Sequence, residues 1–303
     1  MAELVNFGSL CIDSVYSVPG IARRGETVSA LRQARFVGGK GLNQSLAAAR
    51  AGCRVAHCGC VGADGAFLVD ALREAGVDTK GVRVDPSAQS GQALIQVDPT
   101  GANAIVIVGG ANRTLGPRDV AATLASVDAG GWLLMQNEVN AIDEILAAAR
   151  EHHVRVAMNL APADDRVHRY DLDALDLLVM NSIEAAALTG HDAPDRALEA
   201  IAAAHAGLAV VITLGERGLV YGAGDERIRL GAFRVDAVDE TAAGDAFMGY
   251  LMRGWIDERA PRNVLVRASA AGAIAVTVPG AAASIPRADE VDRFLELRRH
   301  ELE

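Results

Sequence analysis

Short apolar runs alternate with helix-like segments along most of this chain. The apolar runs have the length of strands and cover residues 3–8, 54–61, 132–136, 154–159, 177–180 and 209–214. The helix-like segments, several of which stop at a glycine, cover residues 42–51, 66–75, 141–152, 195–206, 243–255, 262–276 and 288–298. Strands that alternate with helices form mostly parallel sheets with helices on both faces. The pattern therefore predicts a doubly wound α/β fold.

Two segments, residues 14–37 and 91–108, do not follow this alternation. The second has the pattern of a hairpin, with apolar runs at 92–97 and 104–108 on either side of the turn sequence Asp-Pro-Thr-Gly at 98–101. Neither segment has a helix of its own to cover it. We expect both to form a small separate sheet that acts as a lid or as a dimer surface, inserted in a single domain spanning residues 1–303.

Composition and charge narrow the range of functions. The chain has 303 residues, 50% of them hydrophobic, which is enough for one large core. The net charge of -10 argues against nucleic acid or an anionic membrane as the main partner. The N-terminus has no signal-like sequence, and no segment supplies the ~18 apolar residues that a membrane span needs. These features predict a soluble, cytoplasmic protein.

Three of the four cysteines lie near one histidine and raise the question of a metal site. Cys53, His57, Cys58 and Cys60 do not have the spacing of known zinc sites. Cys58 and Cys60 also fall within a predicted strand. We therefore expect buried, reduced cysteines that pack as small apolar side chains.

A glycine-rich stretch, Gly38-Gly39-Lys40-Gly41-Leu42-Asn43-Gln44, directly precedes an alanine-rich helix. Paired glycines let the backbone approach a ligand closely, and Lys40 and Asn43 carry donors for hydroxyl groups. The stretch is not a Walker A loop, because Lys40 is followed by glycine instead of Ser or Thr. A plain strand-to-helix turn is the alternative.

A second motif, running from Asp239 to Asp245, leads into another helix. The small residues Ala242, Ala243 and Gly244 would leave backbone N–H groups bare at the helix start, where they suit a phosphate. Asp245 in the same turn could accept a proton from an attacking hydroxyl. Alternatively, Asp245 is only a first-turn carboxylate that the helix dipole favours.

Further polar residues follow other predicted strands. Asn181 and Glu184, three residues apart, could serve phosphate oxygens and hydrated Mg²⁺, or could form an ordinary helix cap. Thr213-Leu-Gly215-Glu-Arg-Gly218 could form a nucleotide loop or a tight turn into the next strand. Asp13 and Glu138 lie after strands, where open α/β sheets bind ligands, unless they are solvated loop charges. No G-x-G-x-x-G follows the first strand, which disfavours a dinucleotide-dependent oxidoreductase.

Taken in this order, the motifs resemble the ribokinase family of carbohydrate kinases, also called the PfkB family. The likeness covers residues 5–285, and its signatures are Gly38–Gln44 and Asp239–Asp245, with Asn181, Glu184 and Thr213–Gly215 between them. Met135–Glu138, Asn159–Pro162 and Gly109–Asn112 resemble ribokinases in particular. The resemblance implies an ATP-dependent kinase that phosphorylates a primary hydroxyl of a small sugar, D-ribose favoured, and a homodimer formed through the lid.

The resemblance also implies a role for each matching residue. The sugar would contact Asp13, Gly39, Lys40, Asn43 and Glu138. Asp245 would be the base, and the backbone of Ala242, Ala243 and Gly244 the anion hole. ATP phosphates and Mg²⁺ would be served by Asn181 and Glu184, and the nucleotide by Thr213, Gly215 and Gly218. A K⁺ site would use Asp239, Thr241, Ala275, Val278, Gly280 and Ser284.

Two positions depart from the family pattern. Cys11 replaces the usual Asn two residues before Asp13, and a thiol is a weak hydrogen-bond partner. Glu240 replaces the usual Thr after Asp239 and adds a charge near the cation site. A nucleoside, a ketohexose or a deoxy-keto sugar acid therefore stays open as the substrate. A non-catalytic sugar- or nucleotide-binding regulator is the alternative from another class.

Overall fold

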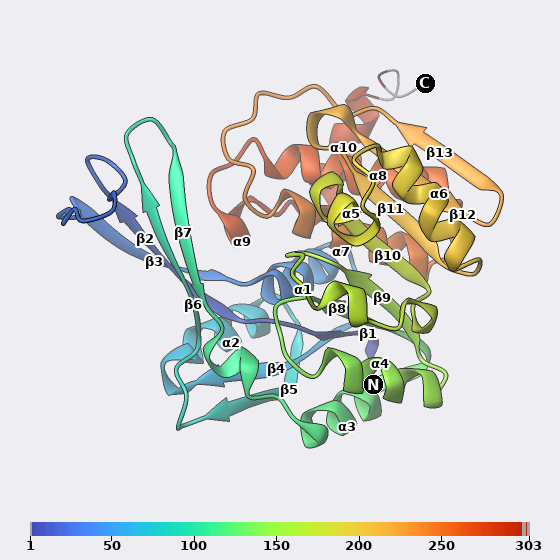
Figure 1. Cartoon of the computed structure of the whole chain (residues 1–303), viewed down its shortest axis with the longest axis horizontal. Coiled ribbons are helices and arrows are strands. Elements are labelled where there is room, and N and C mark those ends of the chain that lie inside the picture. The colour runs from blue at the N-terminus through green and yellow to red at the C-terminus, as the bar shows by residue number, and fades with distance from the viewer. Residues whose placement is uncertain (1, 299–300, 302–303) are drawn as a thin grey trace.

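The computed structural model describes residues 2–298 and 301, and its centre is a twisted nine-stranded sheet (Figure 1). The strand order is β13-β12-β11-β10-β9-β8-β1-β4-β5. Strands β11 to β5 of this order run parallel, and β12 and β13 add an antiparallel edge. The strands are β1 Ala2–Phe7, β4 Val55–Gly62, β5 Asp78–Asp85, β8 Val127–Gln136, β9 Arg155–Asn159, β10 Leu177–Asn181, β11 Ala209–Thr213, β12 Leu219–Ala223 and β13 Glu226–Leu230.

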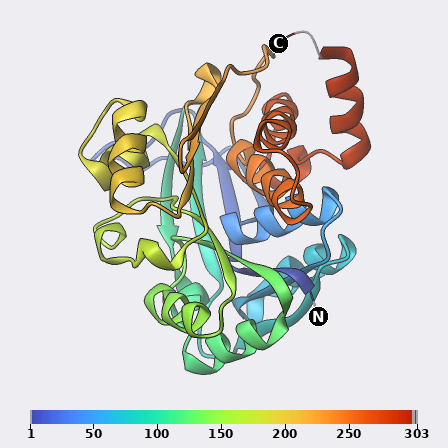
Figure 2. The ribbon, with the colours of Figure 1, turned by 90° about the vertical axis from the view of Figure 1, so that its right-hand side faces the viewer.

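Helices cover both faces of this sheet, as Figure 2 shows from the side. One core joins the sheet to α1 Lys40–Arg50, α2 Ala66–Glu74, α7 Ala243–Ile256, α8 Pro261–Ala275 and α10 Ala288–Arg298. The opposite core joins it to α3 Pro117–Ser126, α4 Ile142–Glu151, α5 Ser182–Thr189 and α6 Pro194–Ala204. The short α9 Ala281–Ser284 follows α8. The predicted doubly wound α/β fold is confirmed.

Alternation along the central strands explains the two cores. In β1, Leu4 packs into the core beneath α1, whereas Val5 and Phe7 pack into the opposite core. Successive side chains of a strand point to opposite faces, so a strand covered on both sides must be apolar at nearly every position. The exception lies toward the carboxyl ends of β1 and β8, where Asn6 and Gln136 are polar and fully buried.

A separate four-stranded sheet projects from the large one, at the left of Figure 1. Its order is β3-β2-β6-β7, with β2 Cys11–Ser17, β3 Arg32–Gly38, β6 Gly91–Val97 and β7 Asn103–Val108. The small sheet expected from the sequence is thus confirmed. Its first strand begins at Cys11, three residues before the predicted segment, because β2 continues almost directly from β1. We call this sheet the lid.

Several strand and helix bounds differ from those predicted. β8 begins at Val127 rather than residue 132, because Gly130 and Gly131 interrupt the apolar run that marks the strand. The edge strands β5 and β13 carry too many polar residues to be recognised along their whole length. All four cysteines are free and buried, as expected. Within residues 2–298 and 301, no helix is long and apolar enough to cross a membrane.

Candidate active site

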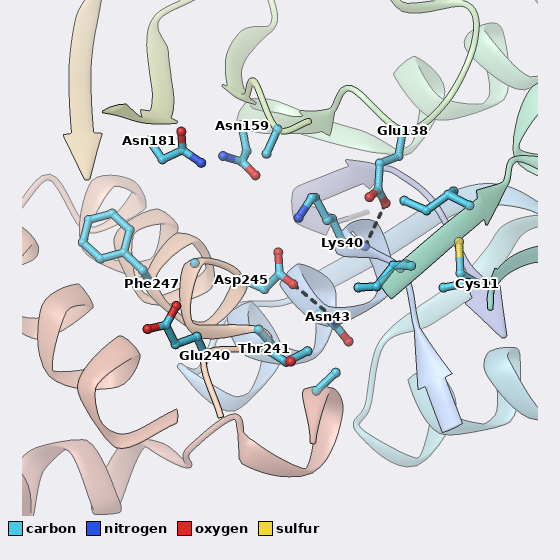
Figure 3. A pocket seen from close by; sticks show the side chains of 18 of the residues that line it. Cys11, Lys40, Asn43, Glu138, Asn159, Asn181, Glu240, Thr241, Asp245 and Phe247 are labelled. Carbon is cyan, nitrogen blue, oxygen red and sulfur yellow. Dashed lines mark hydrogen bonds between the residues drawn. The ribbon is translucent and has the colours of Figure 1, made fainter. Parts of the chain in front are cut away.

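A pocket of about 380 Å³ lies between the lid, the carboxyl ends of the central strands and the start of α7. It sits beside β1 and β8, where the chain order in the sheet reverses, and such switch points are where open α/β sheets bind ligands. Figure 3 shows the side chains that point into it. Among the predicted residues, the wall includes Asp13, Gly39, Lys40, Asn43, Glu138, Asn181, Glu184, Thr213, Thr241, Ala242, Gly244 and Asp245.

The glycine-rich stretch passes close to the end of β1. Gly39 has φ +94°, and a Cβ there would come within 2.9 Å of the Cys11 backbone nitrogen. A Cβ on Gly41 would lie 2.3 Å from the Ser9 backbone nitrogen. Only glycine fits both positions. The close approach starts α1 directly beside the pocket, so that Lys40 and Asn43 in its first turn face the cavity.

Glu138 joins the loop after β8 to the glycine-rich stretch. Its Oε2 accepts a hydrogen bond from the Lys40 backbone N–H at 3.0 Å and another from Ser9 Oγ. The Ser9 hydroxyl also accepts one from the Gly41 N–H at 3.2 Å. These bonds hold one carboxylate oxygen against the protein. The other is left for a ligand.

Three carboxylates surround the Lys40 ammonium. Burial raises the pKa of Asp13 to about 7, helped by the charges of Glu138 and Asp245. Burial opposes the charge of Lys40, but the neighbouring carboxylates Asp245, Glu138 and Glu184 outweigh it and raise the pKa of Lys40. The ammonium is therefore charged at neutral pH. The site is polar, largely shielded from water, and suited to hydroxyl groups.

Asp245 lies in the first turn of α7 and is only 6% exposed. Its Oδ2 accepts a hydrogen bond from Asn43 Nδ2 at 3.1 Å, drawn in Figure 3, and its Oδ1 accepts one from Gln44 Nε2 at 2.9 Å. Both donors come from α1. The carboxylate is thus fixed from the side of α1 and keeps lone pairs that can accept a proton from the pocket.

The turn before Asp245 leaves backbone donors at the pocket. Ala242, at the helix N-cap, has the left-handed conformation, φ 62° and ψ 6°, which is strained for a residue with a Cβ. The Ala243 N–H makes a long bond of 3.3 Å to the Glu240 carbonyl. Within the described part of the chain, the N–H groups of Ala242 and Gly244 have no hydrogen-bond partner. N–H groups that are free at a pocket wall can donate to a negatively charged ligand, as the predicted anion hole requires.

Asn181 and Glu184 form a capping box at the start of α5. Asn181 Oδ1 accepts from the Glu184 N–H at 2.9 Å, and Glu184 Oε2 accepts from the Asn181 N–H at 2.8 Å. Both residues also line the pocket. Burial raises the pKa of Glu184, against the lowering effects of the Asn181 N–H and of Lys40. The helix-cap interpretation is therefore confirmed, and the same two side chains lie at the pocket wall, where the predicted contact with phosphate and Mg²⁺ stays a prediction.

The predicted nucleotide loop is only partly at the pocket. Thr213, the last residue of β11, lines the wall, but Gly215 and Gly218 do not. A Cβ on Gly218, which has φ +89°, would lie 2.0 Å from the Leu230 carbonyl oxygen. That glycine is required by the close approach of β13, so the tight-turn alternative explains it.

The predicted cation residues lie where the loop before α7 meets the loop after α8. Asp239 Oδ1 accepts from the Thr241 N–H at 2.9 Å and from Thr241 Oγ1, and Oδ2 accepts from the Gly280 N–H. The Ser284 hydroxyl donates to the Ala281 carbonyl, and the Ala275 carbonyl accepts from the Val278 N–H. Carboxylate and carbonyl oxygens are hard donors that suit K⁺. The described residues contain no cluster of His, Cys, Asp and Glu able to hold a metal ion.

Some wall residues were not predicted as site residues. The lid contributes an apolar wall of Ala93, Ile95, Ile105 and Ile107, whose alternation in two paired strands signals a common face. Asn159 at the end of β9 and Phe247 in α7 complete the opposite wall. Asn159 belongs to a stretch that resembles ribokinases, and its place at a strand end was the available signal.

Comparison with known proteins agrees with this geometry. A model of the pfkB family carbohydrate kinases matches residues 1–288. The chain belongs to this family. A ribokinase of Haemophilus influenzae is 37% identical over 302 residues, which is 97% of this chain and 98% of that protein. A deoxyribokinase of Salmonella typhimurium is 29% identical over 306 residues, 97% of this chain and 99% of that protein.

Solved structures also support membership of this family. Arabidopsis thaliana ribokinase complexed with ribose and ATP has a TM-score of 0.87 and 27% identity, covering 97% of this chain and 99% of that one. The family assignment made from the motifs is confirmed. The protein is an ATP-dependent carbohydrate kinase.

Proposed function

We propose that this kinase transfers the γ-phosphate of ATP to the primary hydroxyl of D-ribose. The observation that carries the proposal is the position of Asp245, buried between the bare N–H groups before α7 and the polar wall formed by Asp13, Lys40 and Glu138. The pocket of about 380 Å³ has room for a pentose and the end of a triphosphate. The ribokinases among the relatives support ribose as the acceptor.

At the sugar end, charged acceptors and one cation recognise hydroxyl groups. Asp13 and the outer oxygen of Glu138 accept hydroxyl protons, Lys40 donates, and Asn43 contributes its amide beside the backbone of Gly39. A polyol gives up hydrogen bonds to water when it enters, and these groups replace them. The apolar lid face of Ile95, Ile105 and Ile107 covers the sugar and excludes water, which would otherwise compete as acceptor of the phosphate.

At the reacting end, Asp245 takes the proton of the attacking hydroxyl as its oxygen bonds to the γ-phosphorus, while the bond from that phosphorus to the β-phosphate oxygen breaks and ADP leaves. The backbone of Ala242, Ala243 and Gly244 stabilises the charge that grows on the phosphoryl oxygens. We assign Asn181 and Glu184 to the phosphate side of ATP and Thr213, at the pocket wall, to the nucleotide side, with Gly215 and Gly218 in the loop that follows Thr213. The amide and carboxylate of Asn181 and Glu184 suit hydrated Mg²⁺, which supplies neutralisation of phosphate charge when bound.

A panel of sugars and nucleosides tests this proposal. ADP release is measured with ATP and Mg²⁺ for D-ribose, 2-deoxy-D-ribose, a ketohexose, a deoxy-keto sugar acid and a nucleoside. We expect the highest kcat/KM with ribose. A higher value for one of the others would assign that compound as the substrate. Absence of ADP release with all of them would support the non-catalytic alternative.

We further propose that K⁺ binds beside the anion hole through Asp239, Thr241, Ala275, Val278, Gly280 and Ser284. We also propose that the kinase works in the cytoplasm. We also propose a homodimer formed through the lid. Leu94 and Val106 are paired across β6 and β7, Val106 is 60% exposed, and most of β7 is exposed as well. Exposed apolar sheet surface favours association. Light scattering should show a dimer, and Val106→Asp should give a monomer. A monomeric wild-type protein at micromolar concentration would contradict this.

A further inference from the structure

A continuous chain of buried polar side chains runs from Asp245 into the core. The Gln44 amide makes the first two bonds: its Nε2 donates to Asp245 Oδ1, and its Oε1 accepts from Gln136 Nε2 at 2.8 Å. Gln136 Nε2 also donates to Asn6 Oδ1 at 3.0 Å, and Asn6 Nδ2 donates to Ser45 Oγ at 2.9 Å. Ser45, Asn6, Gln44 and Gln136 are all fully buried. Neither Gln44 nor Gln136 lines the pocket.

His57, at the end of this hydrogen-bonded series farthest from Asp245, fixes which group donates in each bond. His57 is fully buried, and burial lowers its pKa to about 4, so its ring is neutral. Its Nε2 lies 3.2 Å from the Gly8 carbonyl, which can only accept, so Nε2 carries the proton. Its Nδ1, 2.8 Å from Ser45 Oγ, must then accept from the Ser45 hydroxyl. Ser45 Oγ in turn accepts from Asn6, and the amide orientations of Asn6, Gln136 and Gln44 follow.

The orientation of Gln136 leaves one of its own atoms without a partner. Among the buried side-chain atoms of the described residues, Gln136 Oε1 has no hydrogen bond. A buried carbonyl without a partner is destabilising, and such cases in native proteins call for an explanation. A flip of the amide would not help, because it would turn Oε1 toward two oxygens, Asn6 Oδ1 and Gln44 Oε1. Gln136 is therefore held in the orientation that serves Gln44.

The sheet brings these side chains together. Asn6 pairs with His57 across β1 and β4, and Gln136 pairs with Asn159 across β8 and β9. On each strand an apolar residue two positions earlier packs into the core beneath α1, as Leu4 does before Asn6 and Leu134 before Gln136. The polar layer thus lies on the same face, directly under α1. It connects the packed core to the floor of the pocket.

We propose that Gln44 is a positioning residue for Asp245 and that the chain of Gln136, Asn6, Ser45 and His57 holds Gln44 in its donating orientation. This inference rests on the proposed role of Asp245 as the base. Gln44 Nε2 uses both of its hydrogens, one on Asp245 and one on Asn159 Oδ1 at 3.0 Å. With Gln136 in place, the Gln44 amide cannot present its oxygen to the carboxylate, which would repel it. The two hydrogen bonds from α1 hold the Asp245 carboxylate in one orientation, with its remaining lone pairs available to the incoming hydroxyl.

The sharper test is Gln136→Met, because Gln136 contacts neither substrate nor Asp245. Methionine has a similar shape but cannot donate to Gln44, so the orientation of the Gln44 amide is no longer fixed. We expect kcat to fall about 5- to 10-fold, the effect of one hydrogen bond, with KM for sugar and ATP unchanged. Gln44→Met removes the donor to a charged group, and kcat should fall about 10- to 100-fold.

A pH profile separates this role from a general loss of structure. A donor to a carboxylate favours its ionised form, so the acid side of the kcat profile should move to higher pH in Gln44→Met. The other charged groups that face Asp245 are unchanged in both variants, so their effects cancel in the comparison; they are Lys40 on α1, Asp13 on β2, Glu184 on α5, and Glu138 and Glu240 on loops.

Leu134→Ala is the matched control. Leu134 lies on β8, two residues before Gln136 on the same face, and is fully buried, but it is not part of the hydrogen-bonded chain. It should lower Tm more than Gln136→Met does, while kcat and the pH profile stay near those of the wild type. If Gln136→Met keeps wild-type kcat and profile, or if Leu134→Ala changes both equally, the inference is wrong. The assay uses whichever sugar the wild type phosphorylates, so a failure of ribose as substrate remains a separate result.

Discussion

The Gly280 N–H donates a hydrogen bond to Asp239 Oδ2 at 2.8 Å, which ties the loop before α7 to the turn after α8. The other oxygen of Asp239 accepts from both the backbone and the hydroxyl of Thr241. The Val276 carbonyl at the end of α8 accepts from the N–H groups of Val238 and Asp239. These bonds brace the turn that we propose as the anion hole, so we expect a ligand bound beside Asp239 to affect how well this turn holds phosphate.

K⁺ should raise the activity. A cation held by the carbonyls around Asp239 would stiffen the turn that carries the Ala242 and Gly244 N–H groups, and pre-organised donors stabilise developing charge. We expect a higher kcat and a higher Tm in K⁺ than in Na⁺ at equal ionic strength. In Asp239→Asn both differences should shrink. Equal kcat and Tm in the two salts would contradict the proposal that K⁺ binds at this site.

Cys11→Asn should improve ribose binding. Cys11 is buried at the pocket wall, and its thiol accepts only a weak bond of 3.5 Å from Asn112 Nδ2. Burial raises the pKa of the Cys11 thiol, so it stays protonated. An amide would add one hydrogen bond to the sugar, worth ~1 kcal/mol, and KM for ribose should fall about 5-fold. Cys11→Ser is the control of intermediate polarity. Unchanged KM in both variants would show that no sugar hydroxyl meets this side chain.

Asp13→Asn should stabilise the fold while weakening sugar binding. The pKa of Asp13 is raised to about 7, above its unfolded value, so the native state binds the extra proton and stability falls as pH rises from about 4 to 7. Removing the charge should raise the free energy of unfolding at pH 8 by roughly 2–4 kcal/mol, and by less at pH 5.

Urea unfolding at the two pH values measures this effect, and KM for the sugar should rise in the same variant. Asp78→Asn is the control, because the Lys80 N–H lowers the pKa of Asp78 and its neutralisation should bring no gain. Equal stability of Asp13→Asn and wild type at pH 8 would show that the Asp13 carboxylate is not strained by its surroundings.

Local signals account for what could be predicted from sequence. Gly39 and Gly41 lie where the backbone of α1 meets Ser9 and Cys11, and such close approaches require glycine within a short stretch. Asp245 follows small residues at a helix start, which is again a pattern of a few neighbours. The α/β alternation is also local. Each of these features can therefore be recognised before the fold is known.

The features that could not be predicted from the sequence depend on contacts between residues far apart in the chain. Asn6 and Gln136 are 130 residues apart, and each alone is an ordinary polar residue near a strand end. Only the pairing of β1 with β8 places them in one chain that leads to Asp245. Gly218 shows how a long-range contact can supply a second explanation for a motif residue. Its place in a glycine-containing loop indicates a nucleotide contact, but the Leu230 carbonyl beside it explains why the residue is glycine.

Asp245→Asn should abolish most of the phosphate transfer without loss of ATP binding. A sugar hydroxyl is a poor nucleophile, and its proton must leave as the bond to phosphorus forms. The introduced amide keeps the size of the side chain but cannot take the proton, so kcat should fall about 10²- to 10⁴-fold. Asn43 can accommodate the change, because its Oδ1 is buried without a partner and a flip of its amide would let it accept a hydrogen bond from the new NH₂ group. The fold and the ATP site with Asn181 and Glu184 should therefore persist, so that Tm and the ATP Kd from calorimetry stay near wild type. A near-normal kcat would rule out Asp245 as the base, and loss of ATP binding would instead make its role structural.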